Sequence, residues 1–253
     1  MSRSFSFDNV DMGTYGLVVE RTDIQGVVQM SQRQLIQYRS YTFKPKFPPK
    51  NISLGVAIAA DDRSTLVGYL DSIKKAVLSD TPYALALDNL TGRYWLAKLE
   101  SMNGSYRAPN FWEGAIVFVA DDPMAFDNTE VGDGNDYAID AAEKTISEVT
   151  GGTGYINPVY NLTAKENLGA ITIKLKNLTT DEELQWTGAL TTDDELEIDV
   201  ANWIVKKNTV ADMSTVTGQF PRLAPDTANS IKVTALYSSV AGNLNIKYRN
   251  RWL

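Results

Sequence analysis

The sequence contains no cysteine and no histidine. Without cysteine there is no disulfide, no thiolate nucleophile and no sulfur-ligated zinc site. Without histidine there is no Ser-His-Asp triad, no His-ligated metal and no side chain that ordinarily titrates near neutral pH. These absences exclude most hydrolase and metalloenzyme mechanisms, so we expect a protein that is not an enzyme and that has no cofactor.

An excess of basic residues and a long hydrophobic run are also missing. The chain carries 24 basic and 31 acidic side chains, for a net charge of -7, which argues against general attraction to nucleic acid or anionic lipid. The longest uncharged apolar stretch, Ile52 to Ala60, is far shorter than the roughly 20 residues that span a bilayer. Met1 to Val10 lacks the apolar run of a secretory signal, so we expect synthesis and retention in a cytoplasm.

What is present is a pattern of short segments rich in β-branched and aromatic residues, each bounded by Gly, Pro, Asn or Asp. This pattern predicts a mainly β protein, and 253 residues suffice for one large or two modest domains. Strands are expected in the first half around Ser4–Phe7, Leu17–Arg21, Gln37–Phe43, Asn51–Ala60, Tyr83–Leu87, Arg93–Ser101 and Glu113–Ala120.

One segment, about 61–79, has the period of an amphipathic helix. Its apolar residues recur at three- and four-residue spacing, beginning at Leu66 and ending at Leu78. Asp61, Asp62 and Ser64 offer N-cap oxygens, and Pro82 follows the segment. We expect one helix here, packed against a sheet.

The composition changes after Asp121, where a run of Asp, Asn, Thr and Gly has little to bury. We therefore expect two domains, residues 1–133 and 134–253. In the second, Ala170–Asn177 alternates apolar and polar residues, and further strand signals recur at short intervals with little helix. A two-sheet sandwich or jelly roll is predicted for residues 134–253.

The acidic run Asp193–Asp199 is the best candidate for paired catalytic carboxylates, as in a glycosidase. However, Glu195, Glu197 and Asp199 alternate with apolar residues, which is typical of the solvent-facing side of a strand. An enzyme is therefore the least favoured of the three functional classes considered.

The segment Arg21–Lys50 is locally basic and includes a polar stretch, Gln25–Ser40, that interrupts the strand pattern. We interpret this stretch as an exposed arm that pairs with a neighbouring subunit. The candidates for subunit contact are Gln29, Met30, Arg33, Leu35, Ile36 and Tyr38.

Three tryptophans of the second half, Trp186, Trp203 and Trp252, provide an alternative function. Exposed indole rings stack on sugars, so the second domain could be a carbohydrate-binding module that recognises host cell-wall glycans. An exposed tryptophan beside polar groups in a concave face would favour this alternative, and burial of all three would exclude it.

Several phrases, taken in order along most of the chain, resemble the distal tail proteins of long-tailed, non-contractile phages of Gram-positive bacteria. In the first half they are Phe5–Val10, Tyr15–Val19, the helix, and Asp122–Phe126. In the second half they are Asn177, Trp186–Gly188, Leu196–Asp199, Gly218–Pro225, Asn229–Ile231 and Tyr248–Leu253. The sequence departs from the family at Pro225–Asn229, where the family has a tighter Pro-Gly-x-Asn turn.

The resemblance implies a structural hub at the tip of a phage tail. It implies an N-terminal β-sandwich or split-barrel-like domain with one helix, which forms a hexameric ring continuing the tail tube, and a C-terminal galectin-like (jelly-roll) β-sandwich. The implied partners are other copies of the chain, the major tail tube protein, the tape measure protein and a tail-associated fibre or lysin protein. DNA would pass through the ring without specific binding, no part would insert into a membrane, and the protein would reside at the distal end of the tail in the virion.

Overall fold

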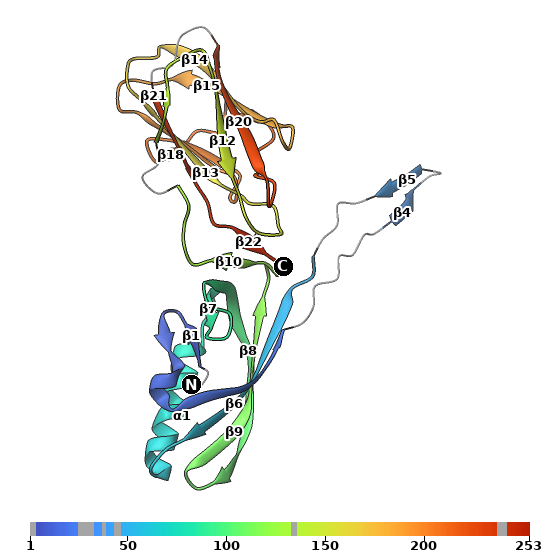
Figure 1. The fold of residues 1–253 in the computed structure, drawn as a ribbon, viewed down its shortest axis with the longest axis vertical. Helices are drawn as coiled ribbons and strands as arrows, with labels where there is room; N and C mark the ends of the chain where they lie inside the picture. The colour runs from blue at the N-terminus through green and yellow to red at the C-terminus, as the bar shows by residue number, and fades with distance from the viewer. Residues whose placement is uncertain (1–3, 25–32, 37–38, 43–46, 133–135, 237–241) are drawn as a thin grey trace. The chain divides into compact units, whose positions relative to one another are not determined.

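The structure is a computed structural model and describes residues 4–24, 33–36, 39–42, 47–132, 136–236 and 242–253. Among these residues the fold is mainly β, as predicted, with one α-helix and several sheets (Figure 1). The chain divides into two compact units, Met1–Phe126 with Leu253, and Asp127–Trp252. The expected boundary between residues 133 and 134 lies outside the described residues.

The first unit contains ten strands, a 3-10 helix and the α-helix within the described residues. They are β1 (Phe5–Phe7), β2 (Val10–Asp11), η1 (Met12–Tyr15), β3 (Leu17–Ile24), β4 (Arg33–Ile36), β5 (Arg39–Thr42), β6 (Lys50–Ala59), α1 (Arg63–Val77), β7 (Tyr83–Leu87), β8 (Arg93–Ala108), β9 (Phe111–Ala120) and β10 (Ala125–Asp127). Seven strands follow one another across a sheet in the order β2-β1-β7-β8-β9-β6-β3, and each neighbouring pair in this order is antiparallel.

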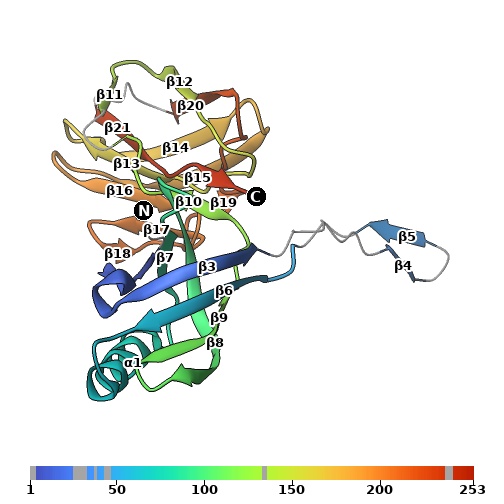
Figure 2. The same cartoon turned by 60° about the horizontal axis from the view of Figure 1, so that its bottom comes forward.

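The helix predicted at 61–79 is confirmed as α1, and its limits have clear causes. Asp62 caps it, because its Oδ1 accepts a hydrogen bond of 2.9 Å from the Thr65 backbone N–H, and this bond lowers the pKa of Asp62. The buried side chains of α1 are Leu66, Leu70, Ile73 and Val77, one stripe at helical spacing. This stripe packs α1 on one face of the sheet (Figure 2).

The core of the first unit lies on the face of the sheet that receives α1, where aromatic residues of β1 and β9 meet. Phe118 of β9 meets Phe5 edge-on at 5.6 Å and stacks on Phe7 at 5.2 Å between ring centroids. Every second residue of β6 from Ile52 to Ile58 is buried on this side. The alternation predicted for a strand with one buried face therefore sets which side of the sheet receives α1.

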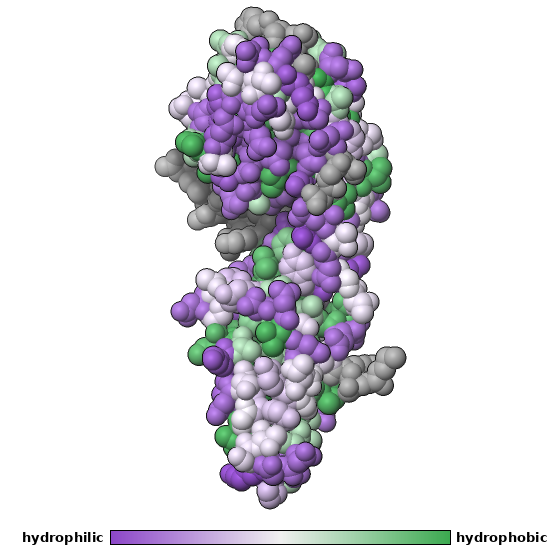
Figure 3. Space-filling model, turned by 90° about the vertical axis from the view of Figure 1, so that its left-hand side faces the viewer, coloured by the Kyte–Doolittle hydropathy of each residue, from purple (hydrophilic) through white to green (hydrophobic). Residues whose placement is uncertain are grey.

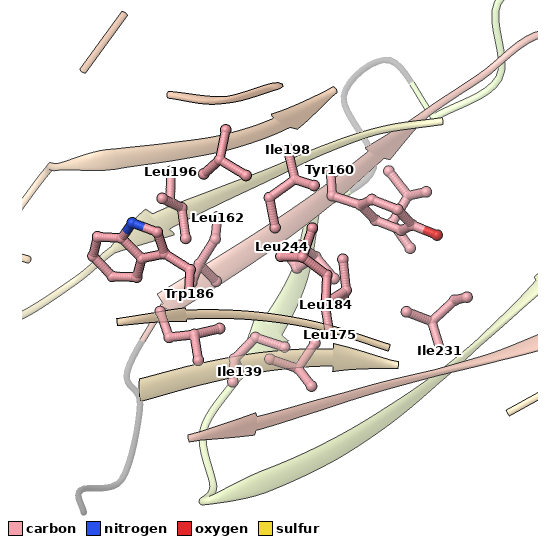
Figure 4. Packing of buried hydrophobic residues seen from close by; sticks show 14 of the residues in the cluster. Ile139, Tyr160, Leu162, Leu175, Leu184, Trp186, Leu196, Ile198, Ile231 and Leu244 are labelled. Atoms are coloured by element: carbon pink, nitrogen blue, oxygen red, sulfur yellow. The ribbon is translucent and has the colours of Figure 1, made fainter. Parts of the chain in front are cut away.

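The second unit is a sandwich of two antiparallel sheets. The strands that follow β10 are β11 (Asp136–Ile139), β12 (Glu143–Val149), β13 (Val159–Ala164), β14 (Ala170–Asn177), β15 (Glu182–Ala189), β16 (Glu195–Asp199), β17 (Ile204–Lys207), β18 (Val210–Ala211), β19 (Thr217–Gly218), β20 (Ala228–Leu236), β21 (Gly242–Lys247) and β22 (Arg251–Trp252). One sheet has the order β11-β21-β13-β16-β17-β18, and the other has the order β12-β20-β14-β15-β19. Both contribute to one hydrophobic cluster, in which Trp186 extends toward Leu162 and Leu196 (Figure 4).

Candidate assembly surfaces

The predicted arm contains a two-stranded hairpin set into the connection between β3 and β6. Within it Arg33 is opposite Thr42 and Ile36 is opposite Arg39, and β4 and β5 form a sheet of their own. Of the six predicted contact residues, Arg33, Leu35 and Ile36 lie in β4, whereas Gln29, Met30 and Tyr38 lie outside the described residues. Because a two-stranded hairpin is marginally stable by itself in water, this one is suited to pairing with another surface.

Two long strands of the first unit have an edge with no neighbour among the described strands. β3 pairs with β6 and ends the sheet. At the other side, β8 pairs with β7 over Tyr94–Ala97 and with the three-residue strand β10, and its last six residues, Asn103–Ala108, are all exposed while pairing with β9. Such edges carry backbone N–H and C=O groups ready to pair with another chain.

The side of this sheet that faces away from α1 is called the open face below. On β6 it carries Asn51, Ser53, Gly55 and Ala57, which alternate with the buried aliphatic residues. The neighbouring strands add Arg21 and Asp23 of β3, Glu113, Ala115, Val117 and Val119 of β9, and Lys98, Ser101, Asn103 and Ser105 of β8. Apart from Ala57, every one of these residues is partly or fully exposed, so the open face is a surface of mostly small or polar side chains.

The charges of the open face occur in opposite pairs. Arg21 lies 3.8 Å from Asp23, and Arg107 Nε donates to Glu113 Oε2 at 3.0 Å. Lys98 lies 3.6 Å from Asp121 at the end of β9. Exposed pairs of this kind add little to stability, but each acid cancels the field of the cation beside it.

A cavity of about 520 Å³ lies at the C-terminal end of α1. Apolar side chains, including Val10, Tyr83 and the 77% exposed Leu78, line it together with Lys75 and a single carboxylate, Asp8. A glycosidase requires two carboxyl groups facing each other across the substrate. The lining of this cavity does not supply that pair.

The acidic run of the second unit has the arrangement expected of a solvent-facing strand. Leu196 and Ile198 are buried in the sandwich, whereas Glu195 is exposed and Glu197 pairs with Lys206 at 2.6 Å. In the described part of the chain, no three His, Cys, Asp or Glu residues are grouped so as to hold a metal ion.

Asp194, at the start of this run, has a structural role in a turn. Its carboxylate accepts hydrogen bonds from the Thr191 backbone N–H at 2.7 Å, from Asn208 Nδ2 at 2.6 Å and from Lys207 Nζ at 3.0 Å. These three donors, the backbone N–H first, hold the pKa of Asp194 well below its usual range. The group is therefore ionised and fully engaged within its own unit.

The three candidate tryptophans have different environments. Trp186 is 1% exposed and donates its Nε1–H to Asp212 Oδ2 at 3.0 Å. Trp252 is half-buried and donates to Asp127 Oδ1 at 2.6 Å. Trp203 alone of the three is broadly exposed, at 72%.

A buried Glu–Tyr cluster that the sequence analysis did not identify joins three parts of the second unit. Glu148 of β12, which is 8% exposed, accepts hydrogen bonds from the hydroxyls of Tyr137 in β11 and Tyr248. Burial, followed by the bond to Glu148, raises the pKa of Tyr137 to about 12 and also raises that of Tyr248. Both hydroxyls stay protonated at neutral pH, so the cluster fastens strands rather than transferring protons.

The helices of the described residues and the surface drawn in Figure 3 bear on contact with a membrane or with a large apolar interface. No helix within the described ranges is long and apolar enough to cross a bilayer. In Figure 3, hydrophobic residues lie scattered among hydrophilic ones over the second unit. The candidate surfaces of this protein are therefore the hairpin, the strand edges and the open face.

The sequence of the second unit matches a model of one protein family, and the fold of the whole chain is similar to that of solved structures. Residues 151–252 match the family model described as siphovirus-type tail component, C-terminal domain. No curated protein matches the sequence. A solved structure of the Dit protein of phage SPP1, described as a paradigm of the hub adsorption apparatus in phages infecting Gram-positive bacteria, has a TM-score of 0.77 at 12% identity over 100% of both chains. A chain of the phage p2 baseplate in its activated, strontium-bound conformation has a TM-score of 0.52 at 10% identity, over 98% of each chain.

Proposed function

We propose that the protein is the distal tail hub of a siphophage virion, because residues 151–252 match the model of the C-terminal domain of siphovirus-type tail components. In this proposal six copies form a ring that connects the tail tube to the adsorption apparatus. Its partners are the tail tube protein, the tape measure protein and a fibre or lysin protein, and the host is Gram-positive. The observation that supports it best is the pair of free strand edges on either side of the open face.

Ring closure requires two different surfaces that fit one another, because a cyclic assembly of more than two copies uses head-to-tail contacts. The strands β3, β6, β9 and β8 alternate in direction, so β3 and β8 run antiparallel to each other. The free edge of β3 in one copy can therefore pair in antiparallel sense with the end of β8 in the next copy. Repetition of this contact gives one continuous sheet around a closed ring.

The same arrangement accounts for a channel. In such a ring the apolar face and α1 lie outside, and the open face lines the lumen. Its small side chains leave room for DNA, and its paired charges, such as Arg107 with Glu113, leave no concentrated positive field to hold the phosphates. DNA then passes without specific binding.

The arm provides a second contact between copies. Its hairpin cannot bury a core alone, and it leaves the sheet between β3 and β6, directly beside one of the two free edges. Residues Gln29, Met30, Arg33, Leu35, Ile36 and Tyr38 are proposed to reinforce the same subunit boundary.

The cysteine-free sequence allows a direct test. Within one copy, β3 and β8 are separated by two strands and thus by roughly 14 Å, beyond the limit of about 7 Å between Cα atoms for a disulfide. Asp23→Cys combined in turn with Asn103→Cys or Ser105→Cys should therefore cross-link only between copies. Under oxidising conditions we expect a ladder of covalent oligomers ending at six chains, which reducing agent collapses to the 28.0 kDa chain.

The single-cysteine variants are the matched controls, because each can form covalent dimers at most. Light scattering of the unmodified protein should give a mass six times that of one chain, alone or after addition of the tail tube protein. A monomer under both conditions, together with no ladder from either double variant, would refute the ring.

A further inference from the structure

Trp203 occupies a backbone conformation that a tryptophan rarely adopts. It ends the turn between β16 and β17, and its φ of 57° lies in the left-handed region, where glycine or asparagine is usual. The turn is set upstream, because the Asp199 carboxylate accepts the backbone N–H of Asn202 at 3.0 Å. A glycine at position 203 would fit this turn with less strain.

The strain is not offset by burial. The side chain is 72% exposed, whereas Trp186 in the same unit is 1% exposed. Its ring contact within the described residues is with Phe220, at 6.0 Å between centroids and an angle of 35°. A large aromatic residue that is both strained and exposed points to a role at the surface rather than in folding.

Polar groups occupy the same turn as Trp203. Asn202 Nδ2 donates to Asp199 Oδ2 at 2.6 Å, which fixes an amide and a carboxylate at the same turn. The sulfur of Met213, which is 42% exposed, accepts the backbone N–H of Val205 in the following strand at 3.1 Å, and Phe220 supports the ring. Ser214 and Gln219, the chain neighbours of Met213 and Phe220, are exposed.

We propose that this surface, formed by Trp203, Phe220, Asp199 and Asn202, is a saccharide-binding platform. A pyranose ring presents a flat face of C–H groups that stacks on an indole, and its hydroxyls need carboxylate and amide partners at the edge of that ring. Asp199 retains lone pairs and Asn202 retains its side-chain carbonyl for such bonds. A protein partner would favour a wider apolar centre than Trp203 and Met213 supply, since interface cores are depleted of such polar groups.

The test uses the full-length protein and three forms at position 203. Wild type, Trp203→Gly and Trp203→Phe are applied to an array of hexose, N-acetylhexosamine and cell-wall oligosaccharides, and the strongest soluble ligand is titrated by calorimetry. We expect wild type to bind, Trp203→Gly to bind at least about tenfold more weakly, a change of about 1.4 kcal/mol, and Trp203→Phe to retain most of the affinity. Because glycine relieves the backbone strain, the Trp203→Gly protein should unfold at an equal or higher urea concentration.

No binding of wild type on the array, or equal binding by Trp203→Gly, would overturn the proposal. A Trp203→Gly protein that loses assembled mass while wild type binds no sugar would make this surface a protein interface and overturn it as well. The ring test above does not depend on position 203, so the two proposals fail separately.

Discussion

Asn177 and Asn229 are joined by a hydrogen bond of 3.0 Å between two side chains that have no exposed surface. Asn177 Nδ2 also donates to the Arg222 carbonyl at 2.6 Å, and Asn229 Oδ1 accepts the Ala224 backbone N–H at 2.8 Å. The pair therefore ties the end of β14 and the start of β20 to the irregular segment between β19 and β20. A buried network is stabilising only when its members are all satisfied.

Replacing Asn229 by Ala should destabilise the second unit by about 3 kcal/mol, because several buried groups lose their partners at once. The measurement is urea unfolding of the full-length protein, monitored by tryptophan fluorescence. Asn167→Ala is the control, since Asn167 is exposed and bonds to Thr192 at the surface, and its effect should stay under about 1 kcal/mol. Equal effects of the two substitutions would show that the buried network does not stabilise this unit.

Gly104 should be irreplaceable for a steric reason. A Cβ at this position would lie 2.2 Å from Cζ2 of Trp112 and 2.6 Å from the Glu113 carbonyl oxygen. Gly104→Ala should therefore destabilise the first unit by about 2 kcal/mol. Gly68→Ala, in α1, is the matched control: it meets no atom within 4 Å and should stabilise by up to about 1 kcal/mol through helix propensity. Thermal unfolding should shift in opposite directions for the two variants, and shifts of the same sign would contradict this account.

Strands and helix with a clear period could be predicted from the sequence. Ala170–Asn177 is found with its expected bounds because apolar and polar residues alternate without interruption. The sequence pattern of Tyr137–Val149 does not distinguish a strand from a helix, and this segment holds most of β11 and all of β12. Glu148 shows the reason. A glutamate in a strand is expected to face solvent, but this one is buried because it accepts hydrogen bonds from two tyrosines that lie outside its own strand.

The candidate assembly surfaces depend on which strands pair with one another, and the periodicity of a short sequence segment does not reveal this. That β3 and the end of β8 are edges follows from the sheet order, which is set by contacts between residues far apart in sequence. The exposure of Trp203 could not be separated from the burial of Trp186, because both lie in or beside apolar strand segments. The family resemblance along the second half, by contrast, includes Asn177 and Asn229, the residues of the buried network.

The carboxylate of Asp194 should make stability depend on pH in the acidic range. Its pKa is lowered in the folded state by the Thr191 N–H, Asn208 and Lys207, so its contribution is present above the unfolded value of about 3.9 and is lost as the pH falls through the folded value. Asp194→Asn should be less stable than wild type at pH 7, and the difference should shrink below about pH 4. Asp193→Asn, at an exposed position with a φ of 67° that asparagine accepts, should follow wild type throughout. A constant difference from pH 7 to pH 2 would refute the assignment.

The hairpin gives the final prediction. Leu35 and Ile36 lie in β4, the strand that pairs with β5 apart from the other sheets. If the arm contacts a neighbouring copy, replacing both residues by Asp places charge in that contact and should weaken assembly, because an unpaired charge is costly to bury. The two units should remain folded, with circular dichroism and unfolding midpoints close to wild type, since β4 and β5 pair only with each other among the described strands.

Val210→Asp, at a 69% exposed site on the second unit, controls for the added charge. An assembled mass that is unchanged in the Leu35/Ile36 double variant would remove the arm from the subunit interface, and the strand edges would then carry ring closure alone.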